Sequence, residues 1–189
     1  RHGTAEFDFL PQTFVLPADT QALHAAMMRE RATWIVKPIA SSRGRGISLV
    51  QHPHQLPADD IVVSRYLDRP LLIDGYKFDL RIYVAITSFE PLRVYVFDEG
   101  LCRFSTERYV LPDSAASLAN QYIHLTNYSI NKKSAAFVAN DDAEADDYGN
   151  KWSLSALRRC LARNSVDVAT LWESIDDLIV KTLVAVEPS

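Results

Sequence analysis

Short apolar runs bounded by turn-forming residues recur through the first two thirds of the chain and predict β-strands. Runs of about four to eight residues rich in β-branched side chains are typical of strands in a protein interior. Residues 61–67 form the clearest such run, nearly continuous in apolar side chains, and indicate a strand buried on both faces. The same criteria predict shorter strands at residues 14–16, 34–37, 47–50 and 71–73.

Residues 76–87 form the longest alternating segment and predict a further strand, central in a sheet and with one end at a cleft. Because side chains alternate along a strand, Lys77, Asp79 and Arg81 share one face, while the apolar residues between them share the other. Such a row of charges is either a ladder of surface ion pairs or one side of a binding site. We favour the binding site.

Two further strands are predicted at residues 92–97 and 101–105. They flank Asp98, Glu99 and Gly100, which predicts a β-hairpin with glycine in its turn. Arg103 stands among apolar residues in the second strand. A half-buried guanidinium needs an anionic partner, because burying an unpaired charge is costly. Either a protein carboxylate or a bound phosphate would serve, and the sequence leaves both open.

Helical spacing of apolar residues predicts the remaining regular elements. Asp19 or Thr20 can cap a helix over residues 20–30, and Asp167 can cap a long packing helix that ends near Val186. Another packing helix is expected at residues 152–161, and residues 112–119 indicate a linker or short helix. Residues 122–129 combine strand-forming residues with polar side chains that can contact a ligand.

Residues 33–50 predict a strand, a basic glycine-rich loop and a second strand, in that order. Lys37 leaves the first strand next to this loop, so cationic side chains and backbone N–H groups could together grip a phosphate. The alternative is an ordinary surface hairpin with an Arg-Gly turn. The order of elements does not fit a P-loop, a dinucleotide-binding turn or the glycine-rich loop of a protein kinase.

Composition narrows the class of protein. With 189 residues, 48% hydrophobic residues and a mean hydropathy of −0.08, the chain fits one globular domain or a large piece of one. No apolar run approaches the roughly 18 residues of a membrane span, and a net charge of −4 argues against a nucleic-acid partner. Two cysteines favour a reducing compartment. His52 and His54 are expected to be solvated, because no further Cys/His cluster completes a metal site.

Five motifs in chain order resemble those of the tubulin–tyrosine ligase-like family, and the match covers nearly the whole chain. They are Trp34-Ile-Val-Lys-Pro, Ser42-Arg-Gly-Arg-Gly, Lys77-Phe-Asp-Leu-Arg-Ile-Tyr, His124-Leu-Thr-Asn-Tyr-Ser and Asn150-Lys-Trp. The run from Ala40 to Gly46, together with residues 142–152, is most similar to the tubulin polyglutamylase branch of the family.

The resemblance implies an α+β fold of the ATP-grasp type. Residues 1–189 would be part of a single catalytic domain, with residues 1–33 as the end of the preceding lobe and a linker helix. Residues implied to bind ATP are Lys37, Ser42, Arg43, Gly44, Arg45, Gly46, Arg65, Tyr66, Leu67, Lys77, Asp79, His124, Thr126 and Asn127. Among these, Lys37 and the loop would contact the phosphates, and residues 65–67 the adenine side. Arg81 and Arg103 are implied to be catalytic, near the γ-phosphate and the acceptor.

The resemblance also implies a reaction. An ATP-dependent ligase would add free glutamate to glutamate side chains in the acidic tails of tubulin, through an acyl phosphate. Mg²⁺ would assist, but the family's metal-binding segment is expected beyond residue 189, so the metal ligands are unknown and the chain alone is expected to be inactive. The implied location is the cytoplasm, on microtubules, including those of the cilium or basal body, with no nucleic acid or membrane as partner.

Two alternatives remain open on the sequence. A member of the same family could add glycine or tyrosine instead of glutamate, or a relative without activity could keep the fold and bind tubulin. The complete set of Lys37, Lys77, Asp79, Arg81 and Arg103 argues against a decayed nucleotide site.

Overall fold

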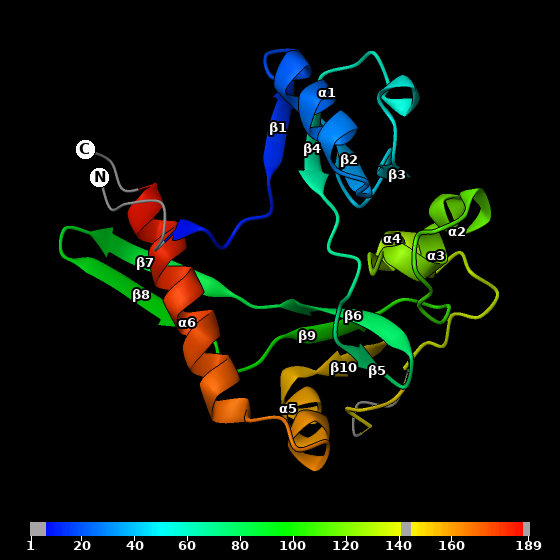
Figure 1. The fold of residues 1–189 in the computed structure, drawn as a ribbon. Helices are drawn as coiled ribbons and strands as arrows, with labels where there is room; N and C mark the ends of the chain where they lie inside the picture. The colour runs from blue at the N-terminus through cyan, green and yellow to red at the C-terminus, as the bar shows by residue number, and fades with distance from the viewer. Residues whose placement is uncertain (1–6, 141–144, 187–189) are drawn as a thin grey trace. The chain divides into compact units, whose positions relative to one another are not determined.

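The computed structural model describes residues 7–140 and 145–186 of the chain. Contacts within the chain divide it into two compact units (Figure 1). Unit 1 comprises Arg1–Phe9, Asp79–Phe104 and Val138–Ser189, and unit 2 comprises Leu10–Phe78 and Ser105–Phe137. Of residues 142–152, which contribute to the resemblance to the polyglutamylase branch, positions 142–144 lie outside the described residues.

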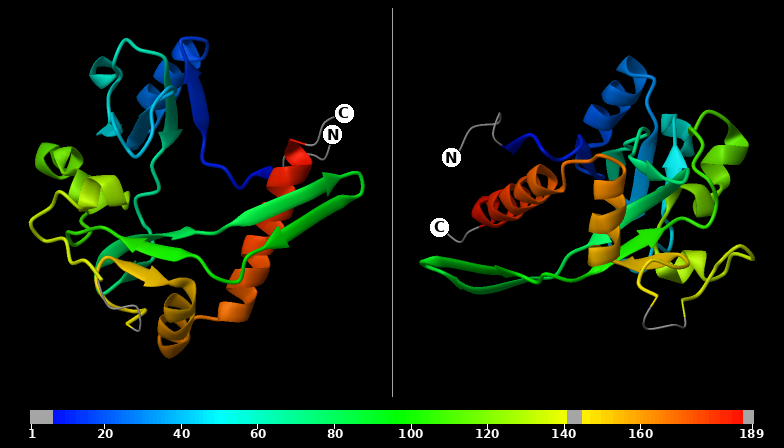
Figure 2. Two further views of the ribbon diagram at one scale, coloured as in Figure 1. Left: turned by 180° about the vertical axis from the view of Figure 1, so that it is seen from behind. Right: turned by 90° about the horizontal axis from the view of Figure 1, so that it is seen from below.

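Unit 2 is built on a four-stranded antiparallel sheet. Its strands are β1 (Thr13–Leu16), β4 (Ile61–Arg65), β2 (Trp34–Pro38) and β3 (Ser48–Val50), in that spatial order. Helix α1 (Thr20–Arg29) packs against the sheet, as both Figure 1 and Figure 2 show. The shared core contains five side chains that are at most 1% exposed: Leu23, Trp34, Val36, Ile61 and Val63. Their burial anchors the strand from which Lys37 projects.

The rest of unit 2 consists of short elements. Strand β5 (Leu72–Ile73) pairs with the first residues of β6 (Tyr76–Arg81), through a turn in which Asp74 and Gly75 have φ of 51° and 82°. The 3₁₀ helix η2 (Pro53–Gln55) follows β3. Helices α2 (Ala115–Ala119), α3 (Gln121–His124) and α4 (Tyr128–Asn131) follow one another, and α2 contacts β3. Residues 122–129, with their strand-forming side chains, therefore lie mainly in α3 and α4.

In unit 1, strand β9 (Leu101–Phe104) lies between β10 (Lys151–Ser153) and β6. Gly100 approaches β6 so closely that a β-carbon on it would lie 2.2 Å from the Arg81 carbonyl oxygen. Strands β7 (Val84–Phe89) and β8 (Leu92–Val96) form a separate two-stranded ribbon. Helix α5 (Leu154–Arg163) packs on β9 and β10, and α6 (Val168–Ala185) follows it.

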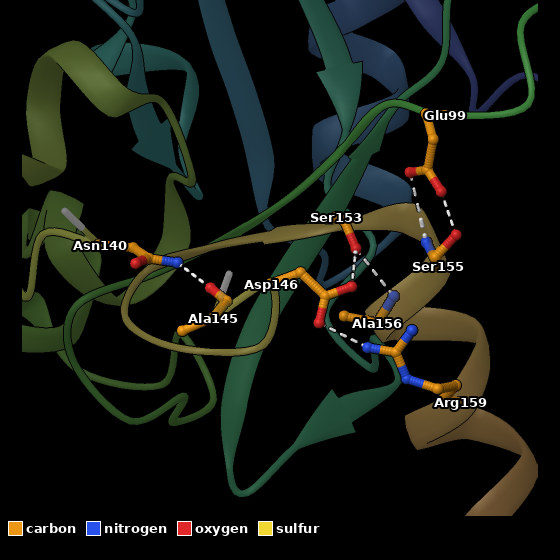
Figure 3. Close-up of polar contacts among 8 residues, drawn as sticks. All are labelled: Glu99, Asn140, Ala145, Asp146, Ser153, Ser155, Ala156 and Arg159. Atoms are coloured by element: carbon orange, nitrogen blue, oxygen red, sulfur yellow. Dashed lines mark hydrogen bonds and ion pairs between the residues drawn. The ribbon is translucent and has the colours of Figure 1, made fainter. Parts of the chain in front are cut away.

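The start of α5 is held by carboxylates (Figure 3). The Ser153 hydroxyl accepts from the Ala156 N–H at 2.9 Å and donates to Asp146 at 2.8 Å. The Glu99 carboxylate accepts a hydrogen bond from the Ser155 hydroxyl, and this bond lowers the pKa of the Glu99 carboxyl group. Negative charge near a helix N-terminus is stabilising, so these two acids fix where α5 begins.

Most predicted elements are confirmed within a residue or two, including the cap of α6, where the Asp167 carboxylate accepts from the Thr170 N–H at 3.1 Å. The packing expected of α6 is weaker than its apolar stripe indicates, because none of its residues within the described range is buried. No helix in the described part of the chain combines the length and apolar character needed to cross a membrane.

Two predictions about the elements are wrong. Residues 76–87 do not form one strand, since the chain leaves β6 after Arg81 and takes β8 as its new partner from Val84. The predicted hairpin of residues 92–105 does not form either. The connection of Glu90 and Pro91 between β7 and β8 is shorter, and short connections favour hairpins.

The helix predicted from residue 152 is present but starts two residues later. Residues 151–153 pair with β9 as β10, with Trp152 opposite Cys102, and Ser153 then serves as the N-cap of a helix that starts at Leu154. Backbone pairing with β9 therefore competes successfully with helix formation at Trp152.

Candidate anion-binding site

The glycine-rich loop lies directly on the start of α4. Arg43, Gly44 and Gly46 all have positive φ, which only glycine adopts without strain. A β-carbon on Gly44 would lie 2.6 Å from Ile130 Cδ1 and 3.0 Å from Asn127 Oδ1. Glycine at position 44 thus allows the loop to touch Asn127, a residue of a second motif far along the chain.

An open polar pocket of about 600 Å³ lies between this loop and the region of α3 and α4. Its charged lining is entirely cationic and consists of Arg43, Arg45, Lys132 and Lys133. Within residues 7–140 and 145–186, none of the four forms an ion pair with a carboxylate. Gln121 and Ser129 add neutral hydrogen-bonding groups. Four cations around one pocket suit a multiply charged anion such as a phosphate chain or a carboxylate-rich peptide.

Lys77 is held within unit 2 by groups from two other elements. Its ammonium donates to the Tyr66 hydroxyl and to the His124 carbonyl oxygen, each at 3.0 Å. The Tyr66 hydroxyl lies 3.1 Å from His124 Nδ1, and His124 Nε2 lies 3.0 Å from the Ser117 carbonyl oxygen. Lys77 Nζ also lies 4.5 Å from the centre of the Tyr66 ring, a cation–π distance.

Tyr66 and His124 are themselves buried, with 6% and 2% of their surface exposed. Burial raises the pKa of the Tyr66 phenol, and burial is also the largest cause of the lowered pKa of His124. His124 is therefore neutral near pH 7, and little of its surface is accessible to solvent.

In unit 1, Arg103 and Asp79 form a two-point ion pair. Arg103 Nε donates to Asp79 Oδ1 at 2.9 Å, and Nη2 donates to Oδ2. These bonds raise the pKa of Arg103 above its usual value. The anionic partner required by this half-buried guanidinium is thus a protein carboxylate. Arg81 ends β6 with an exposed side chain, 5.4 Å from the centre of the Tyr83 ring.

The other residues expected at a nucleotide are placed as follows. Lys37 is exposed in β2, where it pairs with Val62. Arg65 donates to Glu30 at 2.7 Å, and Leu67 is 66% exposed. Thr126 is half-buried between α3 and α4.

Comparison with known proteins agrees with these motifs. The sequence profile of the Tubulin-tyrosine ligase family matches residues 1–189. The chain belongs to the tubulin–tyrosine ligase family. Tubulin polyglutamylase TTLL5 of Homo sapiens is 49% identical over 187 residues, which are 98% of this chain and 14% of that relative.

Two further relatives in the tubulin–tyrosine ligase family also match nearly the whole chain. Tubulin monoglutamylase TTLL4 of Homo sapiens is 48% identical over 190 residues, covering 100% of this chain and 16% of that protein. Tubulin polyglutamylase TTLL7 of Xenopus tropicalis is 39% identical over 189 residues, 97% of this chain and 20% of that protein. The chain therefore spans no more than about a fifth of the length of these relatives.

Several of the residues expected from the family motifs meet in the structure. In unit 2, Gly44 meets Asn127, and Lys77 meets Tyr66 and His124. In unit 1, Asp79 meets Arg103. Whether any of the predicted residues binds a nucleotide or acts in catalysis stays a prediction. The burial of His124 makes direct contact between its ring and a nucleotide the least supported of these roles.

The sequence did not single out three residues next to the motif of residues 124–129. Lys132 and Lys133 line the cationic pocket. Asn131 is 1% exposed, and its amide oxygen accepts from both the N–H and the hydroxyl of Thr106, each at 2.9 Å. The spacing in the sequence could have pointed to Asn131, because it follows Asn127 by one helical turn. In the structure its side-chain amide donates to the Asn127 carbonyl oxygen at 3.1 Å.

The described residues suit the phosphates of ATP but do not form a site for Mg²⁺. The cationic pocket and Lys37 are of the right charge for nucleotide phosphates. For Mg²⁺, no group of three or more His, Cys, Asp or Glu side chains within the described ranges is placed to hold a metal ion. The His52 and His54 rings stack with centres 5.5 Å apart. No step is assigned to a metal here.

Proposed function

We propose that the protein containing this chain is an ATP-dependent ligase of the ATP-grasp type that adds glutamate to glutamate side chains of tubulin tails. The observation that carries this proposal is the cationic pocket formed by the glycine-rich loop with Lys132 and Lys133. The printed names of the relatives, which are tubulin polyglutamylases and a monoglutamylase, support the choice of glutamate and of tubulin.

The reaction needs an activated carboxylate. ATP would transfer its γ-phosphoryl group to an acceptor carboxylate, giving an acyl phosphate and ADP. The amine of free glutamate would then attack the acyl carbon, forming an amide and releasing inorganic phosphate with loss of a proton. Such chemistry depends mainly on positioning and on stabilising charge on the transferring phosphoryl oxygens.

The cations of the chain have roles in this scheme. Lys37 and the loop residues 42–46 would hold the phosphates, with Lys77 and Asp79 at other parts of the nucleotide. Arg81 and Arg103 would act at the γ-phosphate and the acceptor, since a guanidinium can grip phosphate or carboxylate at two points. We propose cytoplasmic microtubules as the location, where such an enzyme meets its substrate.

Calorimetry of ATP binding tests the nucleotide site. In the full-length protein, Lys37→Ala should weaken ATP binding at least about tenfold, the order expected for losing a charge-assisted hydrogen bond. Lys151→Ala, an exposed lysine of β10, is the matched control and should leave the affinity unchanged. A wild-type protein that binds tubulin but no ATP would favour a relative without activity.

Mass spectrometry decides which amino acid is added. Tubulin incubated with the full-length protein, ATP and glutamate should gain glutamate mass increments on its tails, and omission of ATP should abolish them. Parallel reactions with glycine and with tyrosine are the controls. Increments from glycine or tyrosine, with none from glutamate, would refute the proposal.

A further inference from the structure

We propose that Tyr66 and His124 are positioning residues that orient the Lys77 ammonium through a one-directional chain of hydrogen bonds, without touching the nucleotide themselves. This inference rests on the proposed function, in which Lys77 contacts ATP. It differs from the roles implied by the family resemblance, which places both Tyr66 and His124 at the nucleotide.

The direction of the chain is fixed at the Ser117 end. A backbone carbonyl oxygen can only accept, so the short distance of 3.0 Å to His124 Nε2 requires a hydrogen on that nitrogen. In a neutral imidazole the other nitrogen is then an acceptor. His124 Nδ1 must therefore accept from the Tyr66 hydroxyl, 3.1 Å away.

The donor and acceptor roles at His124 also determine how the Tyr66 hydroxyl interacts with Lys77. When the hydrogen of this hydroxyl points to His124 Nδ1, its oxygen is left to accept, and Lys77 Nζ donates to it at 3.0 Å. The Tyr109 side chain is a second hydrogen-bonding neighbour of this hydroxyl and competes with His124 for its hydrogen. The His124 carbonyl accepts a second Lys77 N–H at 3.0 Å. With the Tyr66 ring 4.5 Å from Nζ, three contacts restrict where the ammonium can lie.

The four residues of this arrangement come from separate segments of the chain and all lie in unit 2. Tyr66 directly follows β4, Lys77 is in β6, Ser117 is in α2 and His124 is in α3. Chain segments far apart in the sequence therefore meet at one lysine. A long, flexible side chain such as lysine loses little additional freedom on binding when it is already held, which favours affinity.

Protonation of His124 would reverse the chain. An imidazolium donates from both nitrogens, so Nδ1–H would compete with Lys77 for the Tyr66 oxygen. Burial and the nearby Lys77 cation oppose this change, and the Ser117 carbonyl favours it, with the net effect that the pKa of His124 is lowered. The Tyr66 and Tyr109 rings that face His124 are neutral phenols. Asp68 is connected to this group through its carbonyl oxygen, which accepts from the Tyr109 hydroxyl at 2.7 Å.

Tyr66→Phe in the full-length protein tests the chain, because it removes the hydrogen bonds of the hydroxyl to His124 and Lys77 and keeps the ring. We expect the dissociation constant and the KM for ATP to rise roughly tenfold. In a Lys77→Met background the same substitution should change ATP affinity less than about twofold. Tyr122→Phe, on α3, is the matched control and should have no effect.

The outcomes separate the two proposals. Loss of ATP affinity in Tyr66→Phe that persists undiminished in the Lys77→Met background would refute positioning through Lys77. If Lys77→Met weakens ATP binding but Tyr66→Phe does not, positioning alone is wrong. If Lys77→Met leaves ATP affinity unchanged, the nucleotide role of Lys77 fails, and the positioning proposal with it.

Two substitutions at His124 distinguish loss of the hydrogen bond from loss of packing, with ATP affinity as the measurement. His124→Asn keeps an acceptor on the side of Nδ1, whereas His124→Leu has similar volume and none. We expect Asn to retain more ATP affinity than Leu. Equal affinities for the two His124 variants would contradict the proposal. ATP affinity of the wild type should also fall as acidification protonates His124, which occurs below the ordinary histidine pKa of 6.5, and Tyr66→Phe should flatten that pH profile.

Discussion

Arg103 shows how far a single side chain can be interpreted from sequence. Its apolar neighbours indicate that it needs an anion, but they cannot distinguish a protein carboxylate from a bound phosphate. The structure supplies Asp79, which lies in the neighbouring strand of the same sheet. Both residues were expected in the active site, and their pairing means that each is oriented by the other before any ligand binds.

Asp79→Asn should destabilise the protein, because it leaves the half-buried Arg103 without a charged partner. The side chains are 25% and 36% exposed, so solvent screening limits the cost to about 1 kcal/mol. Urea unfolding of wild type and variant measures this difference. Asp98→Asn, an exposed acid of the same unit, should leave stability within experimental error; equal effects for the two variants would contradict the role of the ion pair.

The lowered pKa of His124 makes stability depend on pH. An unfolded chain binds a proton at the ordinary value of 6.5, whereas the buried ring binds it only at lower pH. Between these two values the unfolded state holds more protons, so stability falls as the pH drops below 6.5 and levels off below the folded pKa.

His124→Gln should remove this part of the pH dependence. Unfolding free energies at several pH values between about 7 and 5 give the slope for wild type and variant. His24→Gln, at an exposed histidine of α1, is the matched control for removal of an imidazole. A wild-type stability that does not change over this range would show that His124 titrates normally.

Among the elements, the glycine-rich loop is the one whose conformation most affects the candidate site. Gly44→Ala introduces a β-carbon at φ of 81° and places it 2.6 Å from Ile130 Cδ1. The loop must move away from Asn127, and we expect ATP affinity to fall roughly tenfold, since a positive φ alone costs about 1–2 kcal/mol.

A second substitution separates the two causes of this loss. Ile130→Ala removes the clashing methyl group but not the backbone strain, so the Gly44→Ala, Ile130→Ala double variant should recover part of the affinity lost in Gly44→Ala. Ile130→Ala alone provides the baseline for the comparison. Full recovery would mean that the positive φ of Gly44 is not needed.

Sequence patterns predicted the positions of strands and helices better than they predicted which strands pair with one another. The alternation of Lys77, Asp79 and Arg81 located β6, but it continues past Arg81 and gives no sign that β7 joins a different sheet. Strand pairing depends on turn lengths and on competing strands, and neither appears in a local pattern. The family motifs named the residues of the candidate site, whereas the pocket-lining role of Lys132 and Lys133 required the fold.

At the scale of the whole molecule, burial is unevenly distributed between elements. The sheet of β1 to β4 and helix α1 share a continuous core. Within the described residues, α6 and the β7–β8 ribbon contain no buried residue. Local opening requires less free energy where few apolar contacts are lost.

Hydrogen–deuterium exchange should therefore differ across the chain. We expect amides of β2 and β4 to exchange most slowly, and amides of β7, β8 and α6 to exchange faster by at least an order of magnitude. Peptide-level mass spectrometry resolves these segments in the full-length protein. Slow exchange throughout α6 would show that other parts of the protein cover it.

The cationic pocket has a consequence for the kinetics of ligand capture. The chain has a net charge of −4, yet Arg43, Arg45, Lys132 and Lys133 gather four positive charges in one place. Long-range attraction accelerates the encounter with an oppositely charged ligand, and salt screens it over about 10 Å at 0.1 M. The association rate of a polyanion should thus fall steeply with ionic strength while its dissociation rate changes little. Lys132→Gln with Lys133→Gln should flatten that dependence in stopped-flow measurements.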